Sequence, residues 1–345
     1  MAEGHYVCLG NPLLDFMVYV KDDKLLEKYK LKKDDAILAD ESHKGLYQEL
    51  EKDHEVTYVA GGAGLNTLKM IQWLFDEPKR TSYFGAIGSD EIGQRLIQNC
   101  KDLHVDVNML VDDTLETGKC AVIVKDINRS MVTTLGAAIS FKESNITQDM
   151  WTKIKRGKIY YMCAYFVNSD METVLSVAKL ASEDDAKIFC FNLSAPFLSE
   201  FFSDRLNKVM PYVDLLFGNA EELRAYAKSQ KLPSDTKTVC EYLYTYQRKN
   251  SKKDRIIVIT DGFNDITLYN KDGLQTFPVE KIDTALIVDS NGAGDAFAGG
   301  FMKEYGLDKD ISQCIMSAKK AARYILQQNG FQLGDKATFE KLTSF

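Results

Sequence analysis

The chain has 345 residues, of which 45% are hydrophobic, and its 43 Lys and Arg against 50 Asp and Glu give a net charge of −7. Such a chain can bury a large core, either as two domains or as one long α/β unit. Because no basic run is present, we expect no nucleic acid partner. A secretion signal and a run of about 18 apolar residues are also missing, so we expect no membrane span.

The seven cysteines form no CxxC pair, and Cys8, Cys163 and Cys190 lie inside apolar runs. A thiol in such a run behaves as a small hydrophobic side chain. We therefore expect reduced cysteines and a cytoplasmic protein, with a nuclear pool allowed.

Short apolar runs alternate with amphipathic stretches along most of the chain. Near-continuous apolar runs, typical of strands covered on both faces, predict strands at residues 6–9, 82–86, 159–162, 188–191, 215–217, 256–260 and 266–269. Apolar residues at helical spacing predict helices at residues 65–75, 92–100, 171–181, 221–227 and 311–326. This alternation predicts an α/β fold with three layers, a mostly parallel central sheet carrying helices on both faces.

Two segments break this rhythm. Residues 16–20 alternate with period two and continue to an apolar run at 36–38, while residues 120–124 and 131–135 flank a polar turn suited to a hairpin. They could form a small sheet that covers a pocket as a lid, or two extra edge strands, and the pattern leaves both open. The lid interpretation assigns residues 16–39 and 114–136 to a small lid domain. Residues 1–15, 40–113 and 137–345 then form the large domain that binds nucleotide and substrate.

A glycine-rich segment precedes a helix near the C-terminus. It follows an expected strand end at residues 287–288 and reads DSNGAGDAFAGGF over residues 289–301. Gly292 and Gly294 permit a tight turn, so the backbone N–H groups at the helix start can face an anion. Asp295 lies in the first helical turn, where the helix dipole favours its ionised form and where it could accept a hydroxyl proton. The alternative is a plain turn with a helix cap.

The full string resembles the C-terminal signature of the ribokinase-like (PfkB) kinases, with Ser290 in place of the usual Thr. The resemblance implies a ribokinase-like fold with a β-rich lid and ATP as phosphate donor. It also implies that Asp295 is the catalytic base and that Asn291 contacts the substrate. The backbone of Gly292, Ala293 and Gly294 would form the anion hole.

A second glycine cluster lies between the two halves of the predicted lid. Gly61, Gly62 and Gly64 come just before Asn66 at the start of a predicted helix. Thr67 occupies the third glycine position of a dinucleotide fingerprint, which makes an oxidoreductase a remote alternative. The glycines allow the backbone to approach a ligand closely and the Asn66 amide can form hydrogen bonds with it, which suits a hydroxylated ligand. The cluster resembles the family's N-terminal signature, whose glycines contact sugar hydroxyls.

Two polar residues follow the first predicted strand. Asp15 could accept two charge-assisted hydrogen bonds from a cis-diol, although a turn cap is the alternative. In the family context Asp15 matches the aspartate that binds the sugar diol, and Asn11 matches its companion.

Four strings resemble the adenosine kinase branch of this family, namely residues 10–15, 192–197, 210–214 and 217–222. This resemblance implies ATP-dependent phosphorylation of the 5′-hydroxyl of adenosine to AMP by a monomer. Another nucleoside or sugar acceptor, or a nucleoside-binding module without catalysis, stays open as an alternative. The adenine would lie among five apolar side chains, Leu38, Cys120, Leu135, Phe166 and Phe197.

The remaining expected site residues concern ATP and its metal. Asn219 and Glu222 are three residues apart and would share one face of a helix. By the resemblance, Asn219 contacts phosphate and Glu222 orders Mg²⁺ through water, with a monovalent cation as a further candidate cofactor. Thr260 and Gly262 match an ATP-side element, and Arg129, in the expected hairpin turn, matches an arginine that reaches the phosphates.

The sequence departs from the adenosine kinase pattern at Ala36, at residues 329–333 and at Lys319, which replaces a polar or aromatic residue often found there. Ala36 stands where these enzymes commonly carry Gln, so one contact from the lid to the base is expected to be missing. Residues 329–333 read NGFQL instead of the expected GCTFP, which weakens any transfer of roles near the adenine of ATP.

Overall fold

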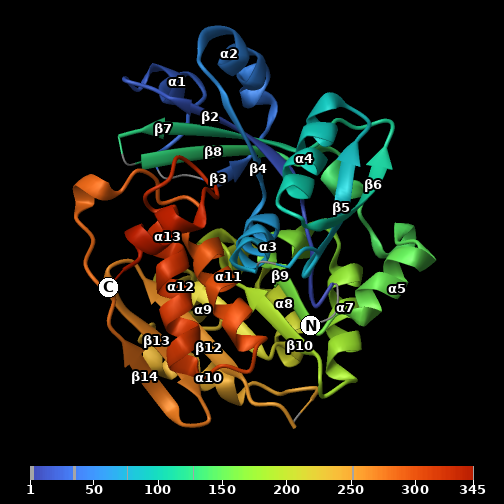
Figure 1. The fold of residues 1–345 in the computed structure, drawn as a ribbon, viewed down its shortest axis with the longest axis vertical. Helices are drawn as coiled ribbons and strands as arrows, with labels where there is room; N and C mark the ends of the chain where they lie inside the picture. Colours follow the sequence, from blue (N-terminus) through green and yellow to red (C-terminus); the bar gives the residue numbers. More distant parts are fainter. Residues whose placement is uncertain (1–3, 34–35, 76, 127, 251, 345) are drawn as a thin grey trace.

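A nine-stranded sheet forms the centre of the computed structural model, which describes residues 4–33, 36–75, 77–126, 128–250 and 252–344 (Figure 1). Its strands, in spatial order, are β14 (Gly273–Phe277), β13 (Asn264–Asn270), β12 (Ile256–Asp261), β11 (Leu215–Asn219), β10 (Ile188–Asn192), β9 (Ile159–Cys163), β1 (Tyr6–Leu9), β5 (Thr81–Gly88) and β6 (Asp106–Asp112). All pairs from β12 to β6 are parallel, whereas β13 pairs antiparallel with both β12 and β14. The seven strands predicted from apolar runs are all confirmed, and the prediction missed β6 and β14 at the edges.

Helices cover both faces of this sheet, because its strands alternate their side chains between two cores. In β1, Tyr6 and Cys8 pack into a core with α3 (Ala63–Leu74), α4 (Glu91–Asp102), α11 (Ala293–Tyr305) and α12 (Ile311–Ile325). Val7 and Leu9 pack into the other core, with α5 (Gln148–Arg156), α6 (Ala164–Ser169), α7 (Met171–Ser182), α8 (Pro196–Val209), α9 (Ala220–Ser229) and α10 (Thr236–Thr245). The predicted three-layer α/β sandwich is therefore confirmed.

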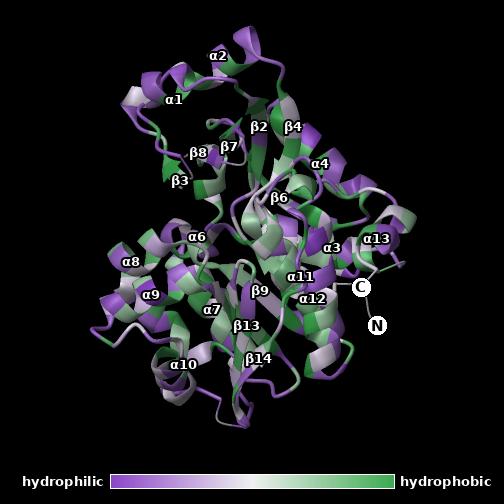
Figure 2. Cartoon of the chain, turned by 90° about the vertical axis from the view of Figure 1, so that its left-hand side faces the viewer, coloured by the Kyte–Doolittle hydropathy of each residue, from purple (hydrophilic) through white to green (hydrophobic). Residues whose placement is uncertain are grey.

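A second sheet stands at one end of this body (Figures 1 and 2). Its five strands, called the lid sheet below, are β3 (Ala36–Leu38), β8 (Asn128–Thr134), β7 (Lys119–Lys125), β2 (Leu13–Tyr19) and β4 (Thr57–Gly61). The two predicted segments do pair with each other, through parallel β2–β7 and β3–β8 contacts. Strand β4 was not predicted, and residue 127 of the predicted hairpin turn lies outside the described residues. The exact domain bounds stay a prediction.

Two helices cover the outer face of the lid sheet. Leu25 and Leu26 of α1 (Lys24–Lys28) and Leu46 and Leu50 of α2 (Leu46–Asp53) pack on the apolar side chains of β2, β7 and β8. The side chains on the inner face of the lid sheet therefore point toward the central sheet and its helices.

Glycines lie where the chain passes between the lid sheet and the body. Gly62 has a φ of +99°, and a Cβ atom there would overlap the carbonyl oxygen of Asn11. Gly136 has a φ of +48°, and a Cβ atom there would overlap the carbonyl oxygen of Glu116. The chain segments can pass this close to each other only because glycine has no side chain.

The expectation of a strand end at residues 287–288 is wrong. The backbone N–H groups of Val288 and Asp289 both donate to the carbonyl oxygen of Leu326, just after α12, at 2.8 and 3.2 Å. The segment is thus held by a helix end and not by a sheet. Within the described ranges, no helix has the length and apolar character needed to cross a membrane.

Candidate active site

A cavity of about 480 Å³ lies between the lid sheet and the carboxyl ends of the parallel strands. This edge is where open α/β sheets bind ligands, and the volume falls within the range of about 300–1,000 Å³ for small-molecule sites. Most residues predicted for the site line it, namely Asn11, Asp15, Leu38, Gly62, Asn66, Cys120, Arg129, Leu135, Phe166, Phe197, Asn219, Glu222, Thr260, Asn291, Gly292, Gly294 and Asp295. Gly61, Ala293 and Gly262 are not among the lining residues.

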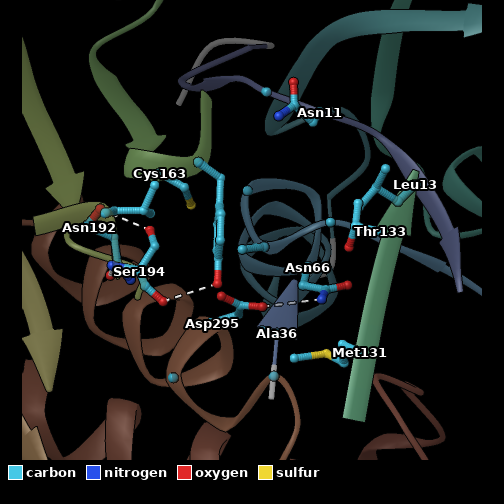
Figure 3. A pocket seen from close by; sticks show the side chains of 18 of the residues that line it. Asn11, Leu13, Ala36, Asn66, Met131, Thr133, Cys163, Asn192, Ser194 and Asp295 are labelled. Carbon is cyan, nitrogen blue, oxygen red and sulfur yellow. Dashed lines mark hydrogen bonds between the residues drawn. The ribbon is translucent and has the colours of Figure 1, made fainter. Parts of the chain in front are cut away.

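Asp295 and Asn66 form the centre of the cavity. The Asn66 side-chain amide donates to Oδ2 of Asp295 at 3.2 Å, and the two lie side by side in Figure 3. They come from the first turns of α11 and α3, two helices that pack against each other. The Asn66 Oδ1 atom is buried and has no hydrogen-bond partner among the described residues. Since buried acceptors in proteins are normally satisfied, a ligand hydroxyl is the expected donor.

The pKa of Asp295 is raised to about 7. Burial is the largest cause, the Asn66 hydrogen bond opposes it, and the nearby carboxylates of Asp15 and Glu222 add to it. Although Asp295 lies in the first helical turn, where the dipole favours ionisation, burial therefore makes the carboxyl group harder to ionise. A carboxylate with a pKa close to neutral is well matched to accepting a proton at physiological pH.

Asp15 lies in strand β2 and not in a turn. Its side chain is only 7% exposed and lies against Gly61 so closely that a Cβ atom at residue 61 would overlap its carboxylate. Gly61 therefore supports Asp15 from behind and does not face the cavity. Burial raises the pKa of Asp15 to about 7, while the cation of Lys69 lowers it and Asp289 raises it further.

The loop before α11 is held in place from several sides. Gly292 has a φ of +75°, a left-handed conformation that favours glycine. Asp289 accepts hydrogen bonds from the backbone N–H groups of Asn291 at 2.5 Å and Gly330 at 2.9 Å. The Ala293 N–H group donates to the carbonyl oxygen of Ser290 at 3.3 Å, so the predicted anion-hole role of Ala293 finds no support in this geometry.

Arg129 connects the lid sheet to this loop. It is the second residue of β8 and not part of the hairpin turn expected from the sequence. Its guanidinium forms an ion pair with Asp289 at 2.6 Å and donates to the Ser290 hydroxyl at 3.3 Å. The positive charge is therefore buried beside the loop that was predicted to bind an anion.

Asn219 and Glu222 form a capping box at the start of α9. The Asn219 side chain accepts from the Glu222 N–H group at 2.8 Å, and Glu222 accepts from the Asn219 N–H group at 3.0 Å. Burial raises the pKa of Glu222 to about 7, so this acid does not belong to a plain surface helix. A carboxylate has about four lone-pair sites, and its bonds to Asn219 leave acceptor capacity for water molecules.

The apolar part of the cavity joins the inner face of the lid sheet to the body. Leu38 and Cys120 come from the lid sheet, and Leu135 follows directly after it, whereas Phe166 lies in α6 and Phe197 in α8. Ala36 also lines the cavity, so the small side chain noted in the sequence leaves open space there.

Sequence reasoning missed several lining residues, among them Cys163, Asn192 and Ser194. Cys163 is the last residue of β9, Asn192 is the last residue of β10, and Ser194 lies two residues further on; all three are labelled in Figure 3. Ser194 has a φ of +68°, and its hydroxyl accepts from the Ala164 N–H group at 3.1 Å. The signal that could have found them is their position at the carboxyl ends of predicted parallel strands.

All seven cysteines are free and buried, as expected. Cys120 and Cys163 face the cavity, and burial raises the pKa of both thiols far from neutral. Neither is therefore an activated nucleophile.

The fold and the site together define a class of phosphotransferase. The model of the pfkB family of carbohydrate kinases matches residues 23–337, and the chain belongs to this family. Within it, the adenosine kinase of Schizophyllum commune is 38% identical over 340 residues, which cover 96% of this chain and 97% of the relative. The resemblance to the adenosine kinase branch is thereby confirmed.

Solved structures agree with this assignment. Adenosine kinase from Schistosoma mansoni in complex with 2-fluoroadenosine matches with a TM-score of 0.93 and 38% identity, covering 98% of this chain and 99% of that one. Anopheles gambiae adenosine kinase, in complex with P1,P4-di(adenosine-5) tetraphosphate, matches with a TM-score of 0.91 and 35% identity, covering 99% and 98%. The predicted ribokinase-like fold is confirmed.

Proposed function

We propose that this protein transfers the γ-phosphoryl group of ATP to the 5′-hydroxyl of adenosine, giving AMP and ADP. The observation that carries the proposal is the buried pair of Asp295 and Asn66 at two helix N-termini, in one cavity with Asp15. Relatives named adenosine kinase match over nearly the whole chain and support adenosine as the acceptor.

Asp15, Asn11 and Asn66 are the groups proposed to hold the ribose. The Asp15 carboxylate would accept from the two ribose hydroxyls, and charge-assisted bonds of this kind are stronger than neutral ones. The Oδ1 atoms of Asn11 and Asn66 are buried and without a hydrogen-bond partner among the described residues, so ligand donors would satisfy them. Gly62 allows the backbone to approach the sugar.

The adenine is proposed to lie in the apolar part of the cavity. Leu38, Cys120, Leu135, Phe166 and Phe197 offer apolar and aromatic surface there, which suits a planar base. Burial of such surface contributes roughly 25 cal/mol per Å².

In the proposed reaction, Asp295 accepts the proton of the 5′-hydroxyl while that oxygen forms a bond to the γ-phosphorus. The bond from this phosphorus to the β,γ-bridging oxygen breaks, and ADP leaves. The backbone of Gly292 and Gly294 and the guanidinium of Arg129 would stabilise the charge that develops on the phosphoryl oxygens. Asn219, Thr260 and Gly262 are proposed to contact ATP.

Mg²⁺ is proposed to bind through water to Glu222, whose carboxylate lines the cavity. Magnesium keeps much of its hydration shell, and one protein carboxylate with substrate phosphates is a common arrangement. Bound there, Mg²⁺ would neutralise charge on the phosphates. The monovalent cation stays a prediction.

The protein is further proposed to act as a cytoplasmic monomer. Helices α1 and α2 cover the outer face of the lid sheet, so this face does not need a second copy to bury its apolar side chains. Light scattering during size-exclusion chromatography would measure the mass and test the monomer.

The proposed function is tested by a panel of acceptors with Mg²⁺ and ATP. The purified protein is assayed with adenosine, inosine, guanosine, ribose and fructose, and the phosphorylated product of each acceptor is measured directly. We expect kcat/KM to be highest for adenosine. Faster turnover of ribose or fructose by kcat/KM would refute the proposed acceptor, and adenosine binding without turnover of any acceptor would indicate a binding module.

A further inference from the structure

Lys69 is a buried cation that the proposed mechanism does not use. It lies in α3, one turn after Asn66, and its side chain is only 4% exposed. Its ammonium group donates to the carbonyl oxygen of Ala60 at 2.6 Å and lies 5.2 Å from the centre of the Phe331 ring. In the described part of the chain no carboxylate is close enough to form an ion pair with it. Since buried lysines are normally paired, this cation calls for an explanation.

Two carboxylates of the active site interact electrostatically with Lys69 without forming an ion pair with it. Burial has the largest effect and lowers the pKa of Lys69, while the carboxylates of Asp15 on β2 and Asp295 on α11 favour its charged form. Cys100 on α4 is a further titratable neighbour, but burial raises the pKa of its thiol to about 11 and keeps it neutral. In return, Lys69 lowers the pKa of both carboxyl groups, against the effect of their own burial. The cation thus partly balances two acids that would otherwise be buried with little compensation.

The second partner of Lys69, the ring of Phe331, touches the anion-binding loop. A Cβ atom on Gly292 would be 2.5 Å from this ring, so the loop rests on it. The preceding residue, Gly330, donates to Asp289 at 2.9 Å, and a Cβ atom on it would be 2.6 Å from the end of Met17 in the lid sheet. These two residues therefore contact both the loop and the lid sheet.

We propose that Lys69 is a positioning residue for phosphoryl transfer. Its ammonium group joins the end of β4 at Ala60 to the Phe331 ring under the anion-binding loop, and its charge keeps Asp15 and Asp295 available as acceptors. The inference deepens the proposed function and rests on it. It also gives a role to residues 329–333, where the sequence departs from the expected pattern.

Lys187 provides a matched control in the same chain. It is also buried, donates to the carbonyl oxygens of Lys155 at 2.8 Å and Gly157 at 2.7 Å, and lies 5.6 Å from the centre of the Tyr160 ring. Neither lysine lines the cavity, but Lys187 also forms an ion pair with Asp184 at 4.0 Å, and none of its contacts belongs to the active site. A purely structural buried lysine should therefore behave like Lys187.

The test measures kcat/KM for adenosine from pH 5.5 to pH 9 in the full chain, together with thermal unfolding. Lys69→Met removes the charge at similar length, Lys69→Arg retains it, and Lys187→Met is the control. We expect Lys69→Met to move the acid limb of the pH profile upward by about one unit, because the carboxyl groups lose a stabilising cation. At pH 6.5 this corresponds to a loss of about tenfold, which should be smaller at pH 9. Lys69→Arg and Lys187→Met should keep the original acid limb.

Phe331→Leu separates positioning from charge. It removes the ring beneath Gly292 but leaves Lys69 charged, so we expect a lower kcat, a nearly unchanged KM for adenosine and an unmoved acid limb. If Lys69→Met fails to fold, Phe331→Leu still tests the inference. An unchanged kcat in Phe331→Leu would then overturn the inference.

The inference is overturned if folded Lys69→Met keeps the acid limb of the unaltered protein, or changes only thermal unfolding as Lys187→Met does. That result differs from failure of the proposed function, in which the unaltered protein itself would phosphorylate no adenosine.

Discussion

Replacing Asp295 by Asn should abolish turnover and at the same time make the protein more stable. The substitution removes the proposed base, whose loss typically costs about 10²–10⁴-fold in rate. The amide is nearly isosteric with the carboxylate and can accept the same hydrogen bond from Asn66. We therefore expect a folded protein that still binds adenosine.

The expected gain in stability follows from the pKa of Asp295. Its ordinary value is 3.8 and burial raises it to about 7, so the folded state resists ionisation of this group. Between pH 4 and pH 7 the folded protein holds a proton that the unfolded chain has released, and the free energy of unfolding falls as pH rises. One pKa unit corresponds to about 1.4 kcal/mol, and water in the cavity screens part of the effect. We expect Asp295→Asn to gain about 2–4 kcal/mol above pH 7 and nothing below pH 4.

Urea unfolding of both proteins at pH 8 and pH 4 measures this difference. Asp90→Asn is a suitable control, because burial of Asp90 is outweighed by hydrogen bonds from Thr117 and from the Gly93 N–H group, which hold its pKa below the ordinary value. Its neutralisation should destabilise the protein at pH 8. The reasoning is refuted if Asp295→Asn turns over adenosine at a near-normal rate, or if it is less stable than the unaltered protein at pH 8.

Four further predictions concern the same cavity. Asp15→Asn should raise the KM for adenosine by roughly 10–100-fold with a smaller change in kcat, measured by steady-state kinetics. Glu222→Gln retains the cap of α9 and should raise the Mg²⁺ concentration for half-maximal rate about tenfold, read from a magnesium titration. Gly292→Ala should cost about 1–2 kcal/mol of stability from its φ of +75° and reduce kcat at least about tenfold as the loop moves off Phe331, measured by unfolding and kinetics. The kcat/KM of the unaltered protein should fall at least about tenfold per unit below pH 7, since Asp295 and Asp15 must both be ionised and the pKa of each is about 7.

The central sheet could be predicted because its strands are covered on both faces. Strand β1 is buried at all four positions, and that burial leaves a continuous apolar run in the sequence. Strands β6 and β14 lie at the sheet edges and retain exposed positions, so their patterns were too mixed to recognise. The parallel contact of β2 with β7 joins segments far apart in the chain, and no local pattern reports such a pairing.

The sequence motifs identified the main site residues but did not reveal how these residues are buried or which residues they contact. The glycine strings pointed to Asp295 and Asn66, whereas the contact between them depends on how α11 packs on α3. The helix-start position of Asp295 suggested easy ionisation, yet its burial beside Asp15 has the larger effect. Lys69 looked like any lysine of an amphipathic helix, because sequence alone does not show that its position is enclosed.

The order of strands in the lid sheet also has a consequence for synthesis on the ribosome. Strand β2 leaves the exit tunnel early, but its parallel neighbour β7 follows only after β5 and β6 of the body have been made. Such non-local pairing slows folding, because the intervening chain must first be closed into a loop. Until then one edge of β2 lacks its strand partner, and Met17 lacks Val122 and Val124 of β7 to pack on. In contrast, α1 and α2 follow β2 closely and can cover Phe16 and Val18 first. The nascent chain would therefore be most prone to aggregate before residue 119 emerges, and a chaperone would be of most use in that interval.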